Sequence, residues 1–244
     1  MQVLKKYILM GGEPLIDRDI IEILDYSSDI GLNVLLETNA VLLDETIDEI
    51  KNIKNLSIRA SIEGPEEIHN IIRRTNSNFN AFEVSIENLI KAKKEKIPIQ
   101  ITCSVNKINF NRLYDMVYYL NNIGLDNIRL RLSMPTSYAF FHWNILKLDL
   151  DDFKEIEKQI DRINSEIQGV RFNSETIKRI NPSFEPKFFI YPEGNVKPYP
   201  FIEYFAGNLI KEDILTILGK YDKIEFPKQE KERMVNYLRA LNMV

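Results

Sequence analysis

Residues 11–14 (GGEP) follow an apolar stretch near the amino terminus and have the types needed to hold a ligand. Paired glycines let the backbone approach a bound group closely, and the carboxylate of Glu13 suits an ammonium group. Further along, His69 and Arg73 are four residues apart and so share one helix face, where the guanidinium suits a carboxylate. The alternative is that Glu13 only caps the following helix and that the other two are surface residues.

The sequence offers few residues that could hold a metal. It contains one cysteine, Cys103, and two histidines, His69 and His142. A single thiol rules out a disulfide framework and any iron–sulfur or metal site made from several cysteines of this chain. A zinc site based on the histidines would need added carboxylates, and no spacing suggests one. We therefore predict no metal ligands here.

Composition is that of an ordinary globular protein. Of 244 residues, 44% are hydrophobic and 28% are charged, and 32 basic against 36 acidic residues give a net charge of −4. This mildly acidic charge, without a basic block, argues against partners such as nucleic acid or anionic membranes. No apolar run is long enough to span a bilayer, and the amino terminus lacks the plan of a signal peptide. We therefore expect a cytoplasmic protein.

The elements that would position these residues alternate between a strand period and a helix period over the first two thirds of the chain. The expected strands are Val3–Met10, Leu32–Thr38, Leu56–Ile62, Pro98–Val105 and Asn127–Ser133. Helical periods separate them, with Asp44 as the expected N-cap of the second helix. A further helix follows over Phe153–Ile167. Five strands joined by helices imply right-handed crossovers and a parallel sheet, hence an α/β fold.

Three of these strands are amphipathic, although both faces of a parallel sheet are usually buried. We interpret the polar face as the lining of an open, partial barrel that holds a ligand, rather than as a half-sheet that faces solvent. The residues expected to line a substrate pocket are Arg59, Thr102, Arg129, Arg131 and Ser133. The two arginines of the last strand suggest an anionic group in the ligand, unless they merely pair with Glu37 and Glu63.

The order of the motifs resembles the radical S-adenosylmethionine superfamily. GGEP is followed at that family's intervals by Thr38-Asn39, by residues 61–65 (SIEGP) and by His69 and Arg73, and the resemblance covers about residues 3–137. It implies a partial (β/α)6 barrel that binds S-adenosylmethionine, with Glu13 holding the amino group and Arg73 the carboxylate. The cofactor-binding residues that it implies are Gly11, Gly12, Glu13, Pro14, Thr38, Asn39, Ser61, Arg73, Ser104 and Asn106.

The family also binds a [4Fe–4S] cluster through three cysteines spaced C-x3-C-x2-C, and this chain does not contain them. The resemblance therefore implies a partial barrel missing its first strand, over residues 1–183. Residues 184–244 resemble the start of a SPASM or twitch appendage, with Tyr199 where the family has a cysteine for an auxiliary cluster. In it we expect a hairpin with a glycine turn at residues 192–195 and helices near Lys211–Lys220 and Lys228–Leu241.

Two functions fit this resemblance. The first is a radical S-adenosylmethionine oxidoreductase that matures a peptide or a small-molecule cofactor, with its cluster-binding segment lost by truncation, by an internal start or to a separate polypeptide. The second is a cluster-free partner protein that binds S-adenosylmethionine or a peptide. An unrelated (β/α) enzyme is disfavoured by the ordered motifs. A complementing chain would pair with the strand edge at Val3–Met10, and the aromatic linker Tyr138–Trp143 is another candidate partner surface.

Overall fold

The computed structural model describes residues 6–74, 78–133, 138–168, 171–173, 189–197 and 204–221. The chain divides into two compact units, one formed by residues 1–133 and 145–177 and the other by residues 134–144 and 178–244. Three sequence predictions lie outside the described residues: the domain boundary between residues 183 and 184, the helix Lys228–Leu241 and the position of Tyr199.

The first unit contains a parallel sheet of six strands in the order β1-β2-β3-β4-β5-β6. The strands are β1 (Lys6–Leu9), β2 (Asn33–Thr38), β3 (Leu56–Ser61), β4 (Ile99–Val105), β5 (Asn127–Leu132) and β6 (Arg171–Asn173). Consecutive strands are neighbours, as expected for crossover connections through helices. The five predicted strands are confirmed. Strand β6 is additional, and its three residues are too few to show a period.

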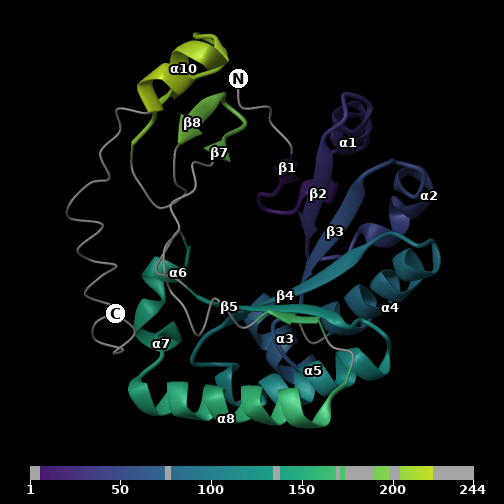
Figure 1. Cartoon of the computed structure of the whole chain (residues 1–244), viewed down its shortest axis with the longest axis vertical. Coiled ribbons are helices and arrows are strands. Elements are labelled where there is room, and N and C mark those ends of the chain that lie inside the picture. The colour runs from purple at the N-terminus through teal and green to yellow at the C-terminus, as the bar shows by residue number, and fades with distance from the viewer. Residues whose placement is uncertain are drawn as a thin grey trace. The chain divides into compact units, whose positions relative to one another are not determined.

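Helices connect the strands and cover one side of the sheet. They are α1 (Ile20–Asp29), α2 (Ile47–Ile50), α3 (Glu66–Arg73), α4 (Ala81–Lys94), α5 (Leu113–Asn122) and α8 (Leu150–Glu166), with 3-10 turns at Pro14–Ile16, Leu43–Glu45 and Phe110–Arg112. The sheet curves from β1 to β5 with these helices on its outer side (Figure 1). The face of the sheet that the helices do not cover therefore lies on the inside of the curve.

The prediction that Asp44 caps the second helix is wrong. Thr46 precedes α2, and its side chain makes no capping hydrogen bond. Asp44 lies in the preceding 3-10 turn, and its carboxylate pairs with Lys91 Nζ on α4 at 2.8 Å. An aspartate just before a helix can either cap that helix or pair with a distant cation. Here the cation is Lys91, 47 residues away in sequence, so no local pattern predicts the pairing.

Alternation along the strands separates an apolar face from a polar one, as predicted. Ala60, Ile101 and Ile128 are aligned across β3, β4 and β5, and each is at most 1% exposed beneath the helices. The residues that alternate with them, among them Arg59 and Arg129, point to the opposite face. The alternation and the strand adjacency predicted from the sequence are therefore confirmed.

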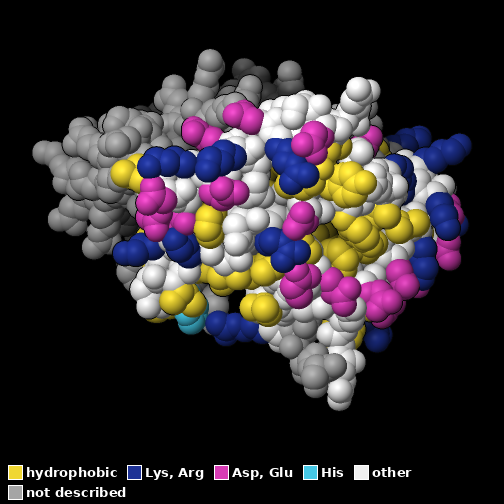
Figure 2. Space-filling view, turned by 90° about the horizontal axis from the view of Figure 1, so that it is seen from below, with side chains coloured by type: hydrophobic (Ala, Val, Ile, Leu, Met, Phe, Trp, Pro, Cys, Tyr) yellow, Lys and Arg dark blue, Asp and Glu magenta, His cyan; other side chains and the backbone are white. Residues whose placement is uncertain are grey.

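The outer surface of this unit carries charges of both signs. Arg162 pairs with Glu166, and Lys154 with Asp151, along α8. Figure 2, which views the protein from the side on which α8 lies in Figure 1, shows basic and acidic side chains interspersed there. Within the described part of the chain, no helix is both long and apolar enough to cross a membrane.

The second unit has a three-stranded antiparallel sheet formed by β7 (Phe189–Ile190), β8 (Asn195–Lys197) and β9 (Gly207–Asn208). The predicted hairpin is confirmed, because β7 and β8 pair and Gly194 turns between them with φ of 82°. Helix α10 (Ile214–Tyr221) matches the predicted helix near Lys211–Lys220. Short helices α6 (Tyr138–Phe141) and α7 (Trp143–Leu146) occupy the predicted aromatic linker.

Candidate functional site

The carboxylate of Glu13 joins the loops that follow β1 and β2. Its Oε1 accepts hydrogen bonds from Thr38 Oγ1 at 2.7 Å and from Leu15 N at 3.2 Å, and its Oε2 accepts one from Asn39 N at 2.7 Å. The bond to Leu15 makes Glu13 the N-cap of the 3-10 turn Pro14–Ile16, so the capping interpretation accounts for part of its role. A carboxylate offers about four acceptor positions, and three are filled here.

Side chains of helix α4 hold the loop after β2 through hydrogen bonds to its carbonyl oxygens. Ser85 Oγ donates to Asn39 O at 2.8 Å, and Asn88 Nδ2 donates to the carbonyl oxygens of Ala40 and Val41 at 3.0 Å. Ala40 adopts a left-handed backbone with φ of 66°, which turns the chain sharply after Asn39. The position of Asn39 beside Glu13 is thus set by a helix more than 40 residues later.

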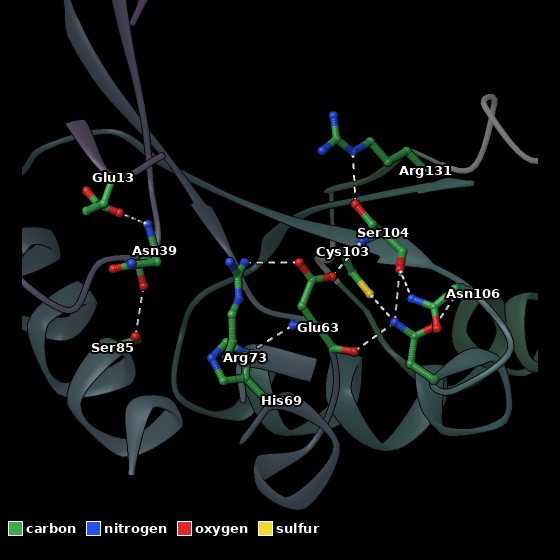
Figure 3. Close-up of polar contacts among 11 residues, drawn as sticks. Glu13, Asn39, Glu63, His69, Arg73, Ser85, Cys103, Ser104, Asn106 and Arg131 are labelled. Atoms are coloured by element: carbon green, nitrogen blue, oxygen red, sulfur yellow. Dashed lines mark hydrogen bonds and ion pairs between the residues drawn. The ribbon is translucent and has the colours of Figure 1, made fainter. Parts of the chain in front are cut away.

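Glu63, in the loop after β3, is the central carboxylate of the site (Figure 3). Its Oε1 lies 3.0 Å from Arg73 Nη2 on α3, and its Oε2 accepts from Ser104 N on β4 at 3.0 Å. Glu63 is 8% exposed, and burial raises its pKa, while the charges of Arg73 and Arg131 and the bond from Ser104 act in the opposite direction. The carboxylate holds three elements together.

His69 is a buried neutral imidazole. It is 1% exposed, its Nδ1 accepts a hydrogen bond from Glu63 N at 3.1 Å, and its ring meets Phe82 edge to face. Burial, with the positive charge of Arg73 as a second cause, lowers the pKa of His69 to about 3. The imidazole therefore shapes the loop before α3 as an acceptor, and it carries no positive charge at neutral pH.

Glu13, Asn39 and Arg73 line one cavity of about 480 Å³. Its wall is completed by His69, by Arg74 and by apolar side chains of Ile16, Val41, Leu42, Phe79 and Ala81. The structure therefore brings together three of the residues expected to bind a cofactor. Glu13 and Asn39 lie in the loops after β1 and β2, side by side in Figure 3, and Arg73 is the last residue of α3.

Gly11 and Gly12 are exposed and lie between β1 and Glu13. A Cβ atom at either position would meet no other atom within 4 Å, and neither has a positive φ. The fold itself thus has no steric need for glycine there. Pro14 is the first residue of the 3-10 turn, where its fixed φ is favourable.

The loop after β4 is held by amides rather than left free. Asn106 uses its Nδ2 to bind Ser104 O and its Oδ1 to accept from Ile108 N, both at 2.9 Å. Asn109, fully buried, donates from Nδ2 to Glu63 O and Ser104 O at 2.9 and 3.0 Å. Arg131 on β5 donates from Nε to Ser104 Oγ at 3.2 Å. Ser104 and Asn106 therefore lie beside Glu63 and do not line the cavity next to Glu13.

The polar face of the sheet has a closed network near its amino end. Arg59 Nη1 meets Glu37 Oε1 at 2.5 Å, and Arg59 Nε donates to Gln100 Oε1 at 2.9 Å. Gln100 Nε2 in turn donates a hydrogen bond to Asn127 Oδ1 at 3.4 Å. One alternative left open by the sequence is thereby decided, because Glu37 and Glu63 pair with Arg59 and Arg73 and not with the arginines of β5.

The remaining predicted positions lie nearer the carboxyl ends of the strands. Ser61, Thr102 and Arg129 are aligned across β3, β4 and β5. Ser133 follows β5 and donates its backbone N–H to Val105 O at 2.9 Å. Ser61, Thr102 and Arg129 share the polar face with Arg59 but form a separate row across the strands.

Sequence reasoning did not assign a role to Asn109, and it treated Glu63 only as an optional partner for an arginine. The signal for Glu63 was its place on the polar face directly after a strand. The signal for Asn109 was weaker: it is the second of three asparagines in the run 106–111. Both act through contacts between segments about 40 residues apart, which no local pattern records.

The family model of the Radical SAM superfamily matches residues 1–120, which contain β1 to β4 and the cavity next to Glu13. The chain carries a radical SAM superfamily domain. An AdoMet-dependent heme synthase of Methanosarcina barkeri is 30% identical to it over 134 residues, which cover 53% of this chain and 37% of that protein. The sporulation killing factor maturation protein SkfB of Bacillus subtilis is 22% identical over 216 residues, which cover 86% and 52%.

Solved structures show the same fold for the radical SAM domain. Streptococcus suis SuiB, bound to its precursor peptide SuiA, superposes with a TM-score of 0.68 at 15% identity, over 86% of this chain and 53% of that chain. SuiB has also been solved bound to S-adenosylmethionine. The chain spans about half or less of the length of these curated relatives.

Cys103 does not fit a cluster site. It is fully buried on the helix-covered face of β4, and burial together with the charge of Glu63 raises its thiol pKa well above its ordinary value. Within the described ranges no group of three or more His, Cys, Asp or Glu side chains is arranged to hold a metal. A cluster needs several thiolates, and this chain has one cysteine in all.

Proposed function

We propose that the radical SAM domain binds S-adenosylmethionine in the cavity next to Glu13 and holds a substrate on the polar face of the sheet. The protein would thus supply the cofactor-binding and substrate-binding part of an oxidoreductase that modifies a peptide or a small molecule. The observation that carries this proposal is the convergence of Glu13, Asn39 and Arg73 on one cavity. The names of the heme synthase and of the maturation protein SkfB, and the precursor peptide bound to SuiB, support these two classes of substrate.

The two ends of an amino acid suit the two charged walls of the cavity. Glu13 keeps acceptor capacity for an ammonium group after its three hydrogen bonds are made. The open space at Gly11 and Gly12 lets a ligand approach the backbone beside it. In enzymes of this superfamily, S-adenosylmethionine supplies radical chemistry when it is bound beside a reduced cluster.

Arg73 retains a donor for a carboxylate although it is paired. Its Nη2 faces Glu63, while its Nε is buried and has no hydrogen-bond partner among the described residues. A guanidinium has five N–H donors, so donors that do not bind Glu63 remain for a ligand. Glu63 then fixes the orientation of Arg73 rather than competing for the cavity.

The cluster is where this chain departs from the family. Because one buried thiol cannot ligate it, the three thiolates would have to be supplied by residues outside this sequence, on the same or another polypeptide. The second candidate function, a cluster-free protein that binds S-adenosylmethionine or a peptide, rests on the same cysteine count. Anaerobic reconstitution of this chain with iron and sulfide tests whether it can bind a cluster by itself. A stoichiometric cluster signal in the electron paramagnetic resonance spectrum would contradict both the need for outside thiolates and the cluster-free function. A SPASM-type role for residues 184–244 and a complementing strand at β1 remain part of the proposal.

Calorimetric titration with S-adenosylhomocysteine tests the cofactor site. We expect weak binding, on the order of −5 kcal/mol, since no iron is present to chelate the amino acid end. Glu13→Gln and Arg73→Gln should each abolish the heat, whereas Glu22→Gln, on the exposed face of α1, should leave it unchanged. Far-ultraviolet circular dichroism of each variant verifies the fold. Absence of heat from the wild-type chain at millimolar ligand would refute the proposal.

A further inference from the structure

A row of three side chains on the polar face of the sheet has unused donors. Register aligns Ser61 with Thr102 and Thr102 with Arg129. Thr102 is 3% exposed, and its Oγ1 is buried without a hydrogen-bond partner among the described side chains. The Nε of Arg129 is also buried and has no hydrogen-bond partner among the described residues. Buried donors are nearly always satisfied, so two orphans in adjacent register positions require an explanation.

The carboxylates near this row are already engaged. Glu37 is held by Arg59, one row nearer the amino ends of the strands, and Glu63 is held by Arg73 at the carboxyl end. Burial, with the charges of Arg59 and Arg131, lowers the pKa of Arg129, and Glu37 only partly offsets this. The row therefore carries one guanidinium whose charge lacks a paired anion in the described part of the chain.

The chemistry of the two orphans is that of an oxyanion site. Thr102 can donate its O–H, and the Nε–H of Arg129 lies on the guanidinium edge that a carboxylate engages side-on together with an Nη. A carboxylate brings one charge, which matches the single unpaired guanidinium. A phosphate dianion would need a second cation at the same depth, and Arg131 is instead exposed and bound to Ser104 Oγ.

We propose that Thr102 and Arg129 bind a carboxylate of the substrate. This inference rests on the proposed function, in which the polar face of the sheet holds the substrate. Thr102 lies two residues before Ser104, whose N–H binds Glu63, the partner of Arg73 at the cofactor cavity. The substrate carboxylate would therefore lie about 6.6 Å closer to the amino end of β4 than Ser104 does. A substrate anchored there extends from this row toward the cavity, so its reacting part lies closer to the cofactor than its carboxylate does.

Nuclear magnetic resonance of the arginine Nε–H groups in the full chain tests this proposal. The Arg129 signal is assigned by its loss in Arg129→Lys. Acetate should shift that signal saturably, while chloride at the same ionic strength should not, and phosphate should bind more weakly than acetate. Thr102→Val should weaken acetate binding about tenfold, because a hydrogen bond to a charged group is lost.

Controls separate this site from its neighbours and from a folding defect. Ser57→Ala, on the same face of β3 but near its amino end, should keep the acetate response of Arg129. Thr102→Val should also raise the melting temperature, since the lost hydroxyl has no partner to leave behind. An Arg129 signal that ignores acetate, responds equally to chloride, or responds unchanged in Thr102→Val would overturn the proposal. Tighter binding of phosphate would overturn the assignment to a carboxylate.

The same variants distinguish this inference from the proposed cofactor site. Thr102→Val and Arg129→Lys should bind S-adenosylhomocysteine as the wild-type chain does, because neither residue lines the cavity next to Glu13. Loss of acetate binding with retained S-adenosylhomocysteine binding supports the carboxylate site. Acetate binding in a chain that fails to bind S-adenosylhomocysteine would refute the proposed function and leave the anion site standing.

Discussion

Glu63 Oε1 lies 3.0 Å from Arg73 Nη2, and the two side chains are 10% and 30% exposed. The pair joins the loop after β3 to the last turn of α3, and the second carboxylate oxygen accepts from Ser104 N on β4. Taking a carboxylate out of water is unfavourable unless its charge is compensated. The Glu63 carboxylate therefore links α3 to the carboxyl ends of β3 and β4, and Asn109 adds a second link through its bonds to Glu63 O and Ser104 O.

Glu63→Gln should lower the free energy of unfolding by about 2 kcal/mol, less than for a fully buried pair because Arg73 is partly exposed. The amide keeps the shape of the side chain but leaves the guanidinium of Arg73 without its counter-charge. Urea denaturation measures the change. Glu67→Gln breaks an exposed pair with Arg112 and should cost less than about 0.5 kcal/mol. Equal losses in the two variants would show that burial of the pair does not matter.

The buried imidazole of His69 should make stability fall as the pH is lowered. Its pKa in the folded state is about 3, below the ordinary 6.5, so between these values the unfolded chain binds a proton that the folded chain does not. His69 should then contribute a loss of about 1.4 kcal/mol for each unit of decreasing pH between about pH 6 and pH 4. The raised pKa of Glu63 acts in the opposite sense, because the folded chain then binds the extra proton.

A difference measurement isolates His69 from Glu63 and from other carboxylates. His69→Gln keeps an acceptor for Glu63 N, and its free energy of unfolding should depend less steeply on pH than that of the wild type in this window. Parallel curves for His69→Gln and the wild type would mean that the imidazole is protonated in the folded chain.

Two glycines of the first unit should tolerate substitution by alanine to different extents. A Cβ at Gly64 would lie 2.7 Å from Ile68 Cγ2 on α3, and the backbone there has φ of 156°. Gly64→Ala should therefore destabilise the fold by about 2 kcal/mol. Gly12→Ala meets open space and should change stability by less than about 0.5 kcal/mol. Thermal unfolding of both variants would contradict this account if their losses were similar.

The single thiol should be inert in the folded protein. Cys103 is fully buried and its pKa is raised, so the reactive thiolate is scarce and shielded. A disulfide reagent that reports free thiols should label the native chain at a rate set by unfolding and label the chain in guanidinium at once, to one thiol per chain. Rapid labelling without denaturant would show that β4 is open to solvent on its helix-covered side.

The order of the strands and helices and the two faces of the sheet follow from local patterns in the amino-acid sequence. Alternation in Leu56–Ile62 and Pro98–Val105 is a local property, because the period of a strand places neighbouring side chains on opposite faces. The same reasoning placed the polar residues at the carboxyl ends of the strands and singled out GGEP. It could not choose between a cap and a ligand site for Glu13, because both use the same carboxylate.

Which charged side chains pair with one another could not be predicted without the folded structure. From the sequence, Glu37 and Glu63 were open partners for the arginines of β5; in the fold they bind Arg59 and Arg73, which leaves Arg129 unpaired among the described side chains. The physical reason is that an ion pair depends on the distance between side chains from different strands and helices. Register and helix placement set that distance across tens of residues, and no period within one segment encodes it.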